Sequence, residues 1–96
     1  MQCILIVDSS PDAADALGQL CEARGHEVDY AYDAASALEA ARRLKPDLLL
    51  LDPLLVDAKR LAEDLHREPL LRAMRIELMA RPLDLARLDA LLGTKR

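Results

Sequence analysis

The pattern of apolar and polar residues divides the chain into short apolar runs that alternate with longer amphipathic stretches. The most informative run is a series of leucines between Pro46 and Pro53 that ends at Asp52. A short apolar run bounded by turn residues indicates a strand buried on both faces, as in a parallel sheet. A buried helix is the competing interpretation, because leucine is not a strong strand former. Pro53 favours the strand, since the residue before a proline is driven away from the helical region.

Other stretches predict the remaining strands and helices. An apolar run ends at Asp8, and two stretches alternate between polar and apolar residues, as half-exposed strands do. The predicted strands are therefore residues 3–7, 27–32, 48–51 and 75–80. Helical spacing of apolar residues predicts helices between them, over residues 11–24, 34–44, 57–67 and 83–92.

Residues that commonly start and stop helices support these limits. Pro11 suits a first helical position after a capping serine, and Asp33 is a capping residue for the second helix. Gly25 and Gly93 suit the position just after a helix. The residues expected to face the core are Ala13, Ala16, Leu17, Leu20 and Cys21 in the first helix, and Leu85, Leu88, Leu91 and Leu92 in the last.

Regular alternation of strand and helix predicts the fold class. It implies a doubly wound parallel α/β sheet with helices on both faces and right-handed crossovers. We expect the strand order 2-1-3-4, which puts Asp8 and Asp52 at the ends of the two central strands. The carboxyl edge of such a sheet is where ligands bind.

Composition narrows the class of protein. The 96 residues suit a single domain spanning 1–96, and Tyr30 and Tyr32 are the only aromatic residues, so the core must be aliphatic. The net charge of −4, with basic residues scattered among acids, argues against nucleic acid as a partner. No apolar run is long enough to span a membrane, and the start of the chain lacks the basic residues of a signal peptide. We therefore expect a cytoplasmic protein in which Cys3 and Cys21 are not bridged.

Several stretches, taken in order, resemble the response-regulator receiver domain. They are Ile4–Asp8, Gly25–Val28, Pro46–Asp52 and Arg81–Leu85. The resemblance implies a flavodoxin-like fold in signal transduction, with Asp52 on the phospho-accepting aspartate and Arg81 on the conserved lysine. It also implies Mg²⁺ ligands from Asp8, Asp52 and the carbonyl of Leu54.

The chain departs from the family pattern around this site. Ser9 stands where a second metal-binding acid is usual, and Met79 or Ala80 stands where the family has a hydroxyl residue. One helix–strand unit of the usual five, with its switch aromatic, is missing between Ala80 and Arg81. The resemblance therefore indicates a truncated, degenerate receiver with four strands, a pseudo-receiver.

The missing unit leaves residues 75–80 as an edge strand, and edges invite pairing with another chain. We expect a homodimer, or contact with another protein, through this strand or the adjacent helix. Alternation puts Arg75, Glu77 and Met79 on one face of the strand, so one face should be open where the missing helix would lie. The two charges are then either solvated or paired across a two-fold axis.

The leading hypothesis is a domain that is not an enzyme and acts by phosphorylation-independent protein contact, with no cofactor or weakly bound Mg²⁺. The second is a working receiver phosphorylated at Asp52 by a histidine kinase. A small enzyme ranks last, since no catalytic Ser-His-Asp or Cys-His arrangement is evident and the first strand–helix turn lacks phosphate-binding glycines. Purely structural roles also exist: Asp52 as a loop cap, Asp8 as part of a helix cap, and Arg81 as a partner that relieves the repulsion of the two acids.

Overall fold

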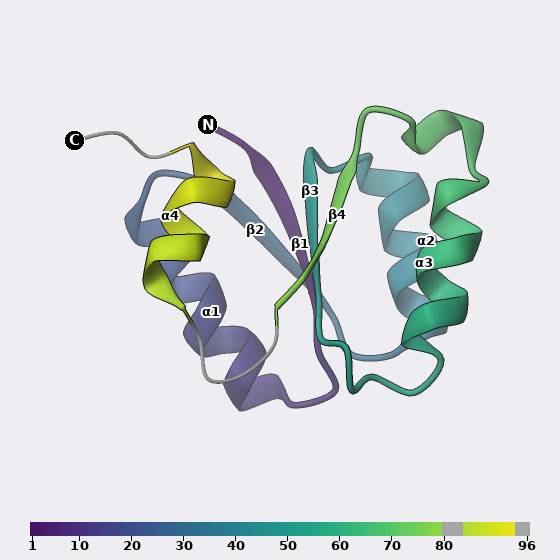
Figure 1. The fold of residues 1–96 in the computed structure, drawn as a ribbon, viewed down its shortest axis with the longest axis horizontal. Coiled ribbons are helices and arrows are strands. Elements are labelled where there is room, and N and C mark those ends of the chain that lie inside the picture. The colour runs from purple at the N-terminus through teal and green to yellow at the C-terminus, as the bar shows by residue number, and fades with distance from the viewer. Residues whose placement is uncertain (80–83, 94–96) are drawn as a thin grey trace.

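The computed structural model describes residues 1–79 and 84–93 of the chain. Figure 1 shows strands and helices alternating along the described part. The strands are β1 (Cys3–Val7), β2 (Glu27–Ala31), β3 (Leu48–Leu51) and β4 (Arg75–Leu78). The helices are α1 (Pro11–Ala23), α2 (Ala34–Leu44), α3 (Ala58–His66) and α4 (Leu85–Leu92), with a short 3-10 turn η1 (Pro69–Leu71) before β4.

The sheet of the described residues has the order β2-β1-β3-β4, and every neighbouring pair is parallel. This confirms the predicted doubly wound α/β fold and the order 2-1-3-4. The leucine run forms β3 and is fully buried, so the helical interpretation of that run is wrong. β3 lies inside the sheet and is covered on both faces, as its unbroken apolar sequence requires.

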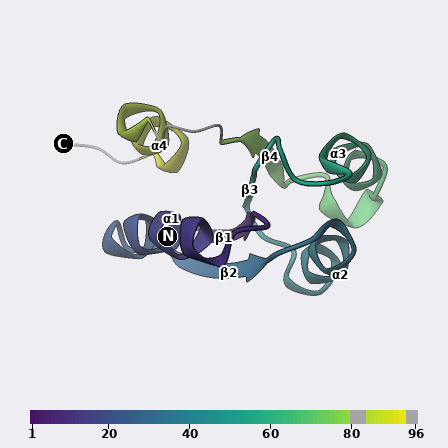
Figure 2. The ribbon, with the colours of Figure 1, turned by 90° about the horizontal axis from the view of Figure 1, so that it is seen from below.

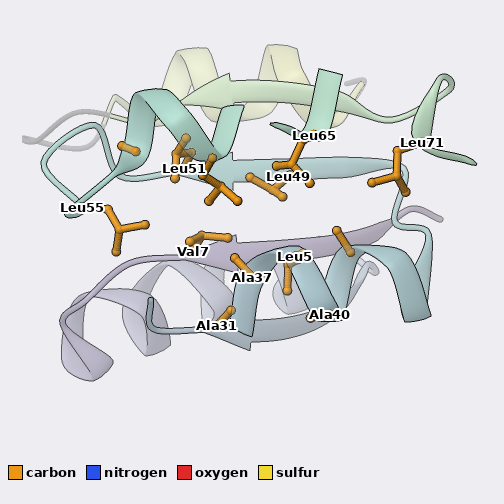
Figure 3. Close-up of a cluster of buried hydrophobic side chains, with 13 residues drawn as sticks. Leu5, Val7, Ala31, Ala37, Ala40, Leu49, Leu51, Leu55, Leu65 and Leu71 are labelled. Carbon is orange, nitrogen blue, oxygen red and sulfur yellow. The ribbon is translucent and has the colours of Figure 1, made fainter. Parts of the chain in front are cut away.

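Two helices cover each face of the sheet. Figure 2 shows α2 and α3 on one side and α1 and α4 on the other. Alternate residues of β1 and β3 point to opposite faces, so their side chains contribute to two separate cores. Figure 3 shows the first core, which combines Leu5, Val7, Leu49 and Leu51 of the sheet with small side chains of α2 and leucines of α3. The second core joins Ile4, Ile6, Leu48, Leu50, Cys21, Met79, Leu88 and Leu92.

The helix ends follow the predicted capping residues. The Ser10 side chain accepts a hydrogen bond from the Ala13 amide at the start of α1, and Asp33 accepts from Ser36 at the start of α2. Gly25 follows α1 with a φ of +88°, a conformation that glycine adopts without strain. Asp57 was expected as the first residue of α3, but it precedes that helix with a φ of +66° and makes no side-chain cap.

Two core predictions are wrong. Ala16 is exposed, and α1 instead buries Ala14 and Gly18, because the helix backbone approaches Tyr30 closely at Gly18. Leu85 is 50% exposed because it begins α4, beyond the part of the helix that overlies the sheet core. Both errors come from helical spacing alone, which identifies an apolar stripe more reliably than its limits.

The surroundings of β4 differ from expectation. On the face that carries Arg75 and Glu77, α4 supplies a hydrogen-bond partner for each charge, although Arg75 stays exposed. On the opposite face Leu78 is 50% exposed, so both faces of the strand are partly open. The predicted end of this strand at Ala80 lies outside the described residues.

Cys3 and Cys21 are not bridged, as predicted. Cys21 lies in the second core, where burial raises the pKa of its thiol to about 11. Burial also raises the pKa of Cys3, although that side chain is only half-buried. No helix in the described part of the chain is both long and apolar enough to cross a membrane.

Candidate functional site

Asp8 and Asp52 end neighbouring strands at the carboxyl edge of the sheet. Val7 and Leu51 are paired across β1 and β3, so the two acids occupy the next position on each strand. The Asp52 amide donates to the Val7 carbonyl at 2.9 Å, which extends the ladder one step beyond the strands. Both acids are buried, each with 8% of its surface exposed, although most Asp residues lie on protein surfaces.

Each acid also holds its own loop. Oδ1 of Asp8 accepts a hydrogen bond from the Ser10 amide at 2.8 Å, and Oδ1 of Asp52 accepts from the Leu54 amide at 3.0 Å. Both bonds reach two residues ahead, which is the pattern of an Asx turn. Both acids therefore have a structural role in holding their loops, although the residue that caps α1 is Ser10 and not Asp8.

The donor set for a metal ion at this edge is small. Within residues 1–79 and 84–93, no group of three or more His, Cys, Asp or Glu residues is placed to hold a metal ion. Mg²⁺ prefers oxygen ligands and commonly uses one or two carboxylates together with several waters. Asp8 and Asp52 suit that chemistry, while Ser9 is exposed and adds no third carboxylate. The Leu54 carbonyl as a metal ligand stays a prediction.

The end of β4 places a thioether beside this edge. The amide of Met79 donates to the carbonyl of Leu51 at 2.9 Å, so Met79 directly follows the strand next to Asp52. Its side chain is buried, and its sulfur lies 3.6 Å from Nη1 of Arg87. A thioether accepts hydrogen bonds weakly and donates none, so it cannot replace a hydroxyl donor. Arg81, expected at the position of the family's lysine, lies outside the described residues.

Two features of this edge were not predicted from the sequence: the exposed apolar side chains of Leu54 and Val56, and the contacts of Arg87. Leu54 and Val56, in the loop after Asp52, are 86% and 80% exposed. The available clue was the presence of apolar residues in a stretch predicted to be a loop, between Pro53 and Asp57. Arg87 also contacts the Leu78 carbonyl and Glu77, which joins α4 to β4. No local pattern indicates that contact, because it depends on where α4 packs.

A family model for the response regulator receiver domain matches residues 4–79. The chain belongs to the response regulator receiver domain family. The match runs from β1 to the residue after β4, so α4 lies beyond it.

Two relatives by sequence are mycobacterial regulators. The chain is 36% identical over 64 residues to the Probable transcriptional regulatory protein TcrX of Mycobacterium tuberculosis, a match that covers 67% of this chain and 27% of that protein. It is 41% identical over 54 residues to the DNA-binding response regulator MtrA of Mycolicibacterium smegmatis, which covers 56% of this chain and 24% of the relative. The chain thus matches about a quarter of the length of each relative.

Solved receiver structures share the fold. The signal receiver domain of a signal transduction histidine kinase from Syntrophus aciditrophicus aligns with a TM-score of 0.85 and 21% identity, covering 100% of this chain and 94% of that one. The signal receiver domain of a DNA binding response regulator from Colwellia psychrerythraea 34H aligns with a TM-score of 0.85 and 19% identity, covering 95% and 94%. At this identity the likeness concerns the fold alone.

Membership of the family gives the broad function. Receiver domains serve two-component signal transduction, where they interact with histidine kinases and partner proteins. They are generally signalling domains and not enzymes. The specific role of this receiver depends on what Asp52 and its surroundings do.

Proposed function

We propose that this receiver signals through protein–protein contact without phosphorylation of Asp52. One observation carries the proposal: among the residues that the structure describes, those around the buried acids lack reactive groups that the family uses. Ser9 replaces an acid, and Met79 brings a buried thioether to the end of β4. Each acid meanwhile retains a structural role, because Oδ1 of Asp8 and of Asp52 accepts a backbone amide.

The magnitudes support the same conclusion. A hydrogen bond to a charged group contributes about 1.5–3 kcal/mol, and the Met79 side chain cannot donate one to a phosphoryl group. Moving a two-state switch from 1:99 to 99:1 requires about 5.5 kcal/mol of differential stabilisation. A phosphoryl group on Asp52 would have fewer interactions from which to obtain that difference.

Chemical phosphorylation tests the proposal directly. The protein is incubated with acetyl phosphate and Mg²⁺, and its intact mass is measured. We expect no stoichiometric, Mg²⁺-dependent mass increase, and no change of fold or oligomer with beryllofluoride. A receiver with a complete site serves as the positive control.

The alternative function is a working receiver that is phosphorylated at Asp52 by a histidine kinase. The burial of Asp52 next to Asp8 at the carboxyl edge favours it. In this case Asp8, Asp52 and the Leu54 carbonyl would hold Mg²⁺, which would neutralise the charge of the incoming phosphoryl group. Arg81 would pair with that group or, as we favour, with the two acids.

Stoichiometric modification that requires Mg²⁺ would establish the alternative, provided that Asp52→Asn abolishes it. Asp57→Asn is the matched control, because Asp57 is an exposed acid in the same loop. If modification persists in Asp52→Asn, it occurs at another residue, and the proposal for Asp52 stands.

The proposed partners are proteins: a histidine kinase, a downstream signalling protein or a second copy of the chain. The edge strand β4 and the adjacent α4 are the proposed contact surface. The negative net charge is the reason that we do not propose nucleic acid as a partner of this chain, although one relative is named a DNA-binding regulator. The proposal includes a cytoplasmic location, which two unbridged cysteines suit.

A further inference from the structure

The outer side of β4 presents backbone groups to a further strand. The amides of Arg75 and Met79 donate inward, to the carbonyls of Asp47 and Leu51 beside β3. Since successive residues of a strand direct these groups to opposite sides, the N–H and C=O groups of Ile76 and Leu78 point outward. Among the described residues, no strand lies beyond β4.

The charges on β4 alternate in sign along one face. Arg75 is exposed, and Nη2 of its guanidinium donates to the Leu91 carbonyl at 2.7 Å. Glu77 lies 3.4 Å from Arg87, a long contact that involves one carboxylate oxygen. A guanidinium has several N–H groups and a carboxylate has two oxygens, so both side chains retain capacity for another partner.

We propose that two copies of the chain pair through β4, antiparallel, about a two-fold axis at Ile76. In this register Ile76 faces Ile76 of the partner subunit, and the two residues exchange both backbone hydrogen bonds. Arg75 then lies opposite Glu77 of the partner subunit, and the symmetry gives the same pair twice. Opposite charges in facing positions stabilise paired strands. The inference rests on the proposed function, in which output occurs by protein contact.

The register one residue along is less favourable. An axis at Glu77 would place Glu77 opposite Glu77 of the partner subunit, and like charges in facing positions are destabilising. That register would also need the Leu78 carbonyl to accept from the other copy, but Arg87 already donates to this carbonyl.

The register centred on Ile76 leaves Arg87 in place. In this register the next facing pair is Leu78 and Met74 of the partner subunit. The Met74 amide already donates to the Leu71 carbonyl at 3.1 Å, so it needs no acceptor from the other copy. On the same face, the half-exposed side chains of Leu78 and Met74 would cover each other. The charges, the backbone groups and the apolar side chains of this edge thus favour the same register, centred on Ile76.

Charge reversal tests this register. The variants Arg75→Glu and Glu77→Arg each make both cross-strand pairs repulsive, so each should weaken the dimer about tenfold or more. In an equimolar mixture, the heterodimer of the two variants has only opposite-charge pairs, so it should form with the wild-type affinity. Arg72→Glu is the matched control, since Arg72 is exposed and lies outside the strand. Sedimentation velocity over a range of concentrations measures each constant.

A second measurement needs no variant. In the wild-type chain, the Ile76 amide should exchange with solvent deuterium more slowly as concentration rises into the dimer range. The inference is overturned if the wild-type protein remains a monomer at all concentrations, or if Arg75→Glu dimerises as tightly as the wild type. A mixture of folded variants that stays monomeric also overturns it. These outcomes are separate from the phosphorylation test, which measures the mass of Asp52-modified protein and not its association.

Discussion

The two edge strands of the sheet, β2 and β4, differ in the charges that they carry. Both strands leave one side without a neighbour among the described residues. On β2 the exposed charges are Glu27 and Asp29, which have the same sign. On β4 the charges are Arg75 and Glu77, which have opposite signs.

The difference concerns self-association. A strand that carries only acids repels a second copy of itself in every register, and charge on an edge strand is a known protection against pairing. A strand with alternating signs repels a copy in one register and attracts it in another. The charges therefore disfavour pairing of β2 with a second copy, whereas on β4 they favour one pairing register over another.

The support of β4 depends on Leu88, which anchors α4 in the second core and is fully buried. Leu88→Ala should lower the free energy of unfolding by about 2–5 kcal/mol, because it leaves a cavity under α4. Leu85→Ala in the same helix should change it by no more than about 0.5 kcal/mol, because Leu85 is half-exposed. Urea denaturation measures both values. Equal losses would show that α4 does not pack as described.

The support of β2 depends on Gly18, where α1 approaches Tyr30. A β-carbon at Gly18 would lie 2.0 Å from the Tyr30 hydroxyl oxygen, closer than any real contact. Gly18→Val should therefore destabilise the protein by about 1–3 kcal/mol through overpacking. Ala16→Val, on the exposed face of the same helix, should cost less than about 0.7 kcal/mol. If the two variants are equally stable in urea, the close contact is not a constraint.

One ion pair joins the helices behind the two edges. Arg24 at the end of α1 lies 2.5 Å from Asp89 of α4, and both side chains are mostly shielded from solvent. A double-mutant cycle with alanine at both positions should give a coupling energy of about 0.2–1 kcal/mol. The more exposed pair Arg42–Glu68 is the comparison and should give less coupling. Coupling in the reverse order would mean that burial does not decide the strength of these pairs.

The smallest effect is a pH dependence at the amino end of β2. Burial lowers the pKa of His26, the positively charged amino terminus lowers it further, and Nδ1 of the ring accepts the Gln2 amide at 2.9 Å. Because the folded pKa is below the unfolded value of about 6.5, the unfolded chain binds the proton more readily. Stability should fall as the pH drops below about 6.5, until the folded protein is protonated as well.

His26→Gln removes this titration, so its unfolding midpoint in urea should depend less on pH than the wild-type midpoint over about pH 5–8. A variant that keeps the full wild-type dependence would assign the effect to other groups.

The sequence predicted most of the framework because local rules and burial agreed. Pro53 favoured a strand covered on both faces over a helix for the leucine run, and Asp33, Gly25 and Gly93 placed helix ends correctly. The position of Asp8 and Asp52 followed from the strand order alone. The chemistry of the site was less accessible, because the same carboxylates can cap loops and bind metal ions. Hydrogen bonds to Ser10 and Leu54 became visible only in three dimensions.

The sequence was sufficient to predict the order of the strands, helices on both faces of the sheet and the acids at its carboxyl edge. These follow from the period of the apolar residues, which predicts each element, and from the regular alternation of strands and helices. Only the three-dimensional packing shows that Ala16 and Leu85 face outward and that β4 is partly exposed on both faces, at Arg75 and at Leu78. It also shows that Arg87 meets Glu77 and the Leu78 carbonyl. Those features depend on the orientation and position of α1 and α4 on the sheet, which no local sequence pattern specifies.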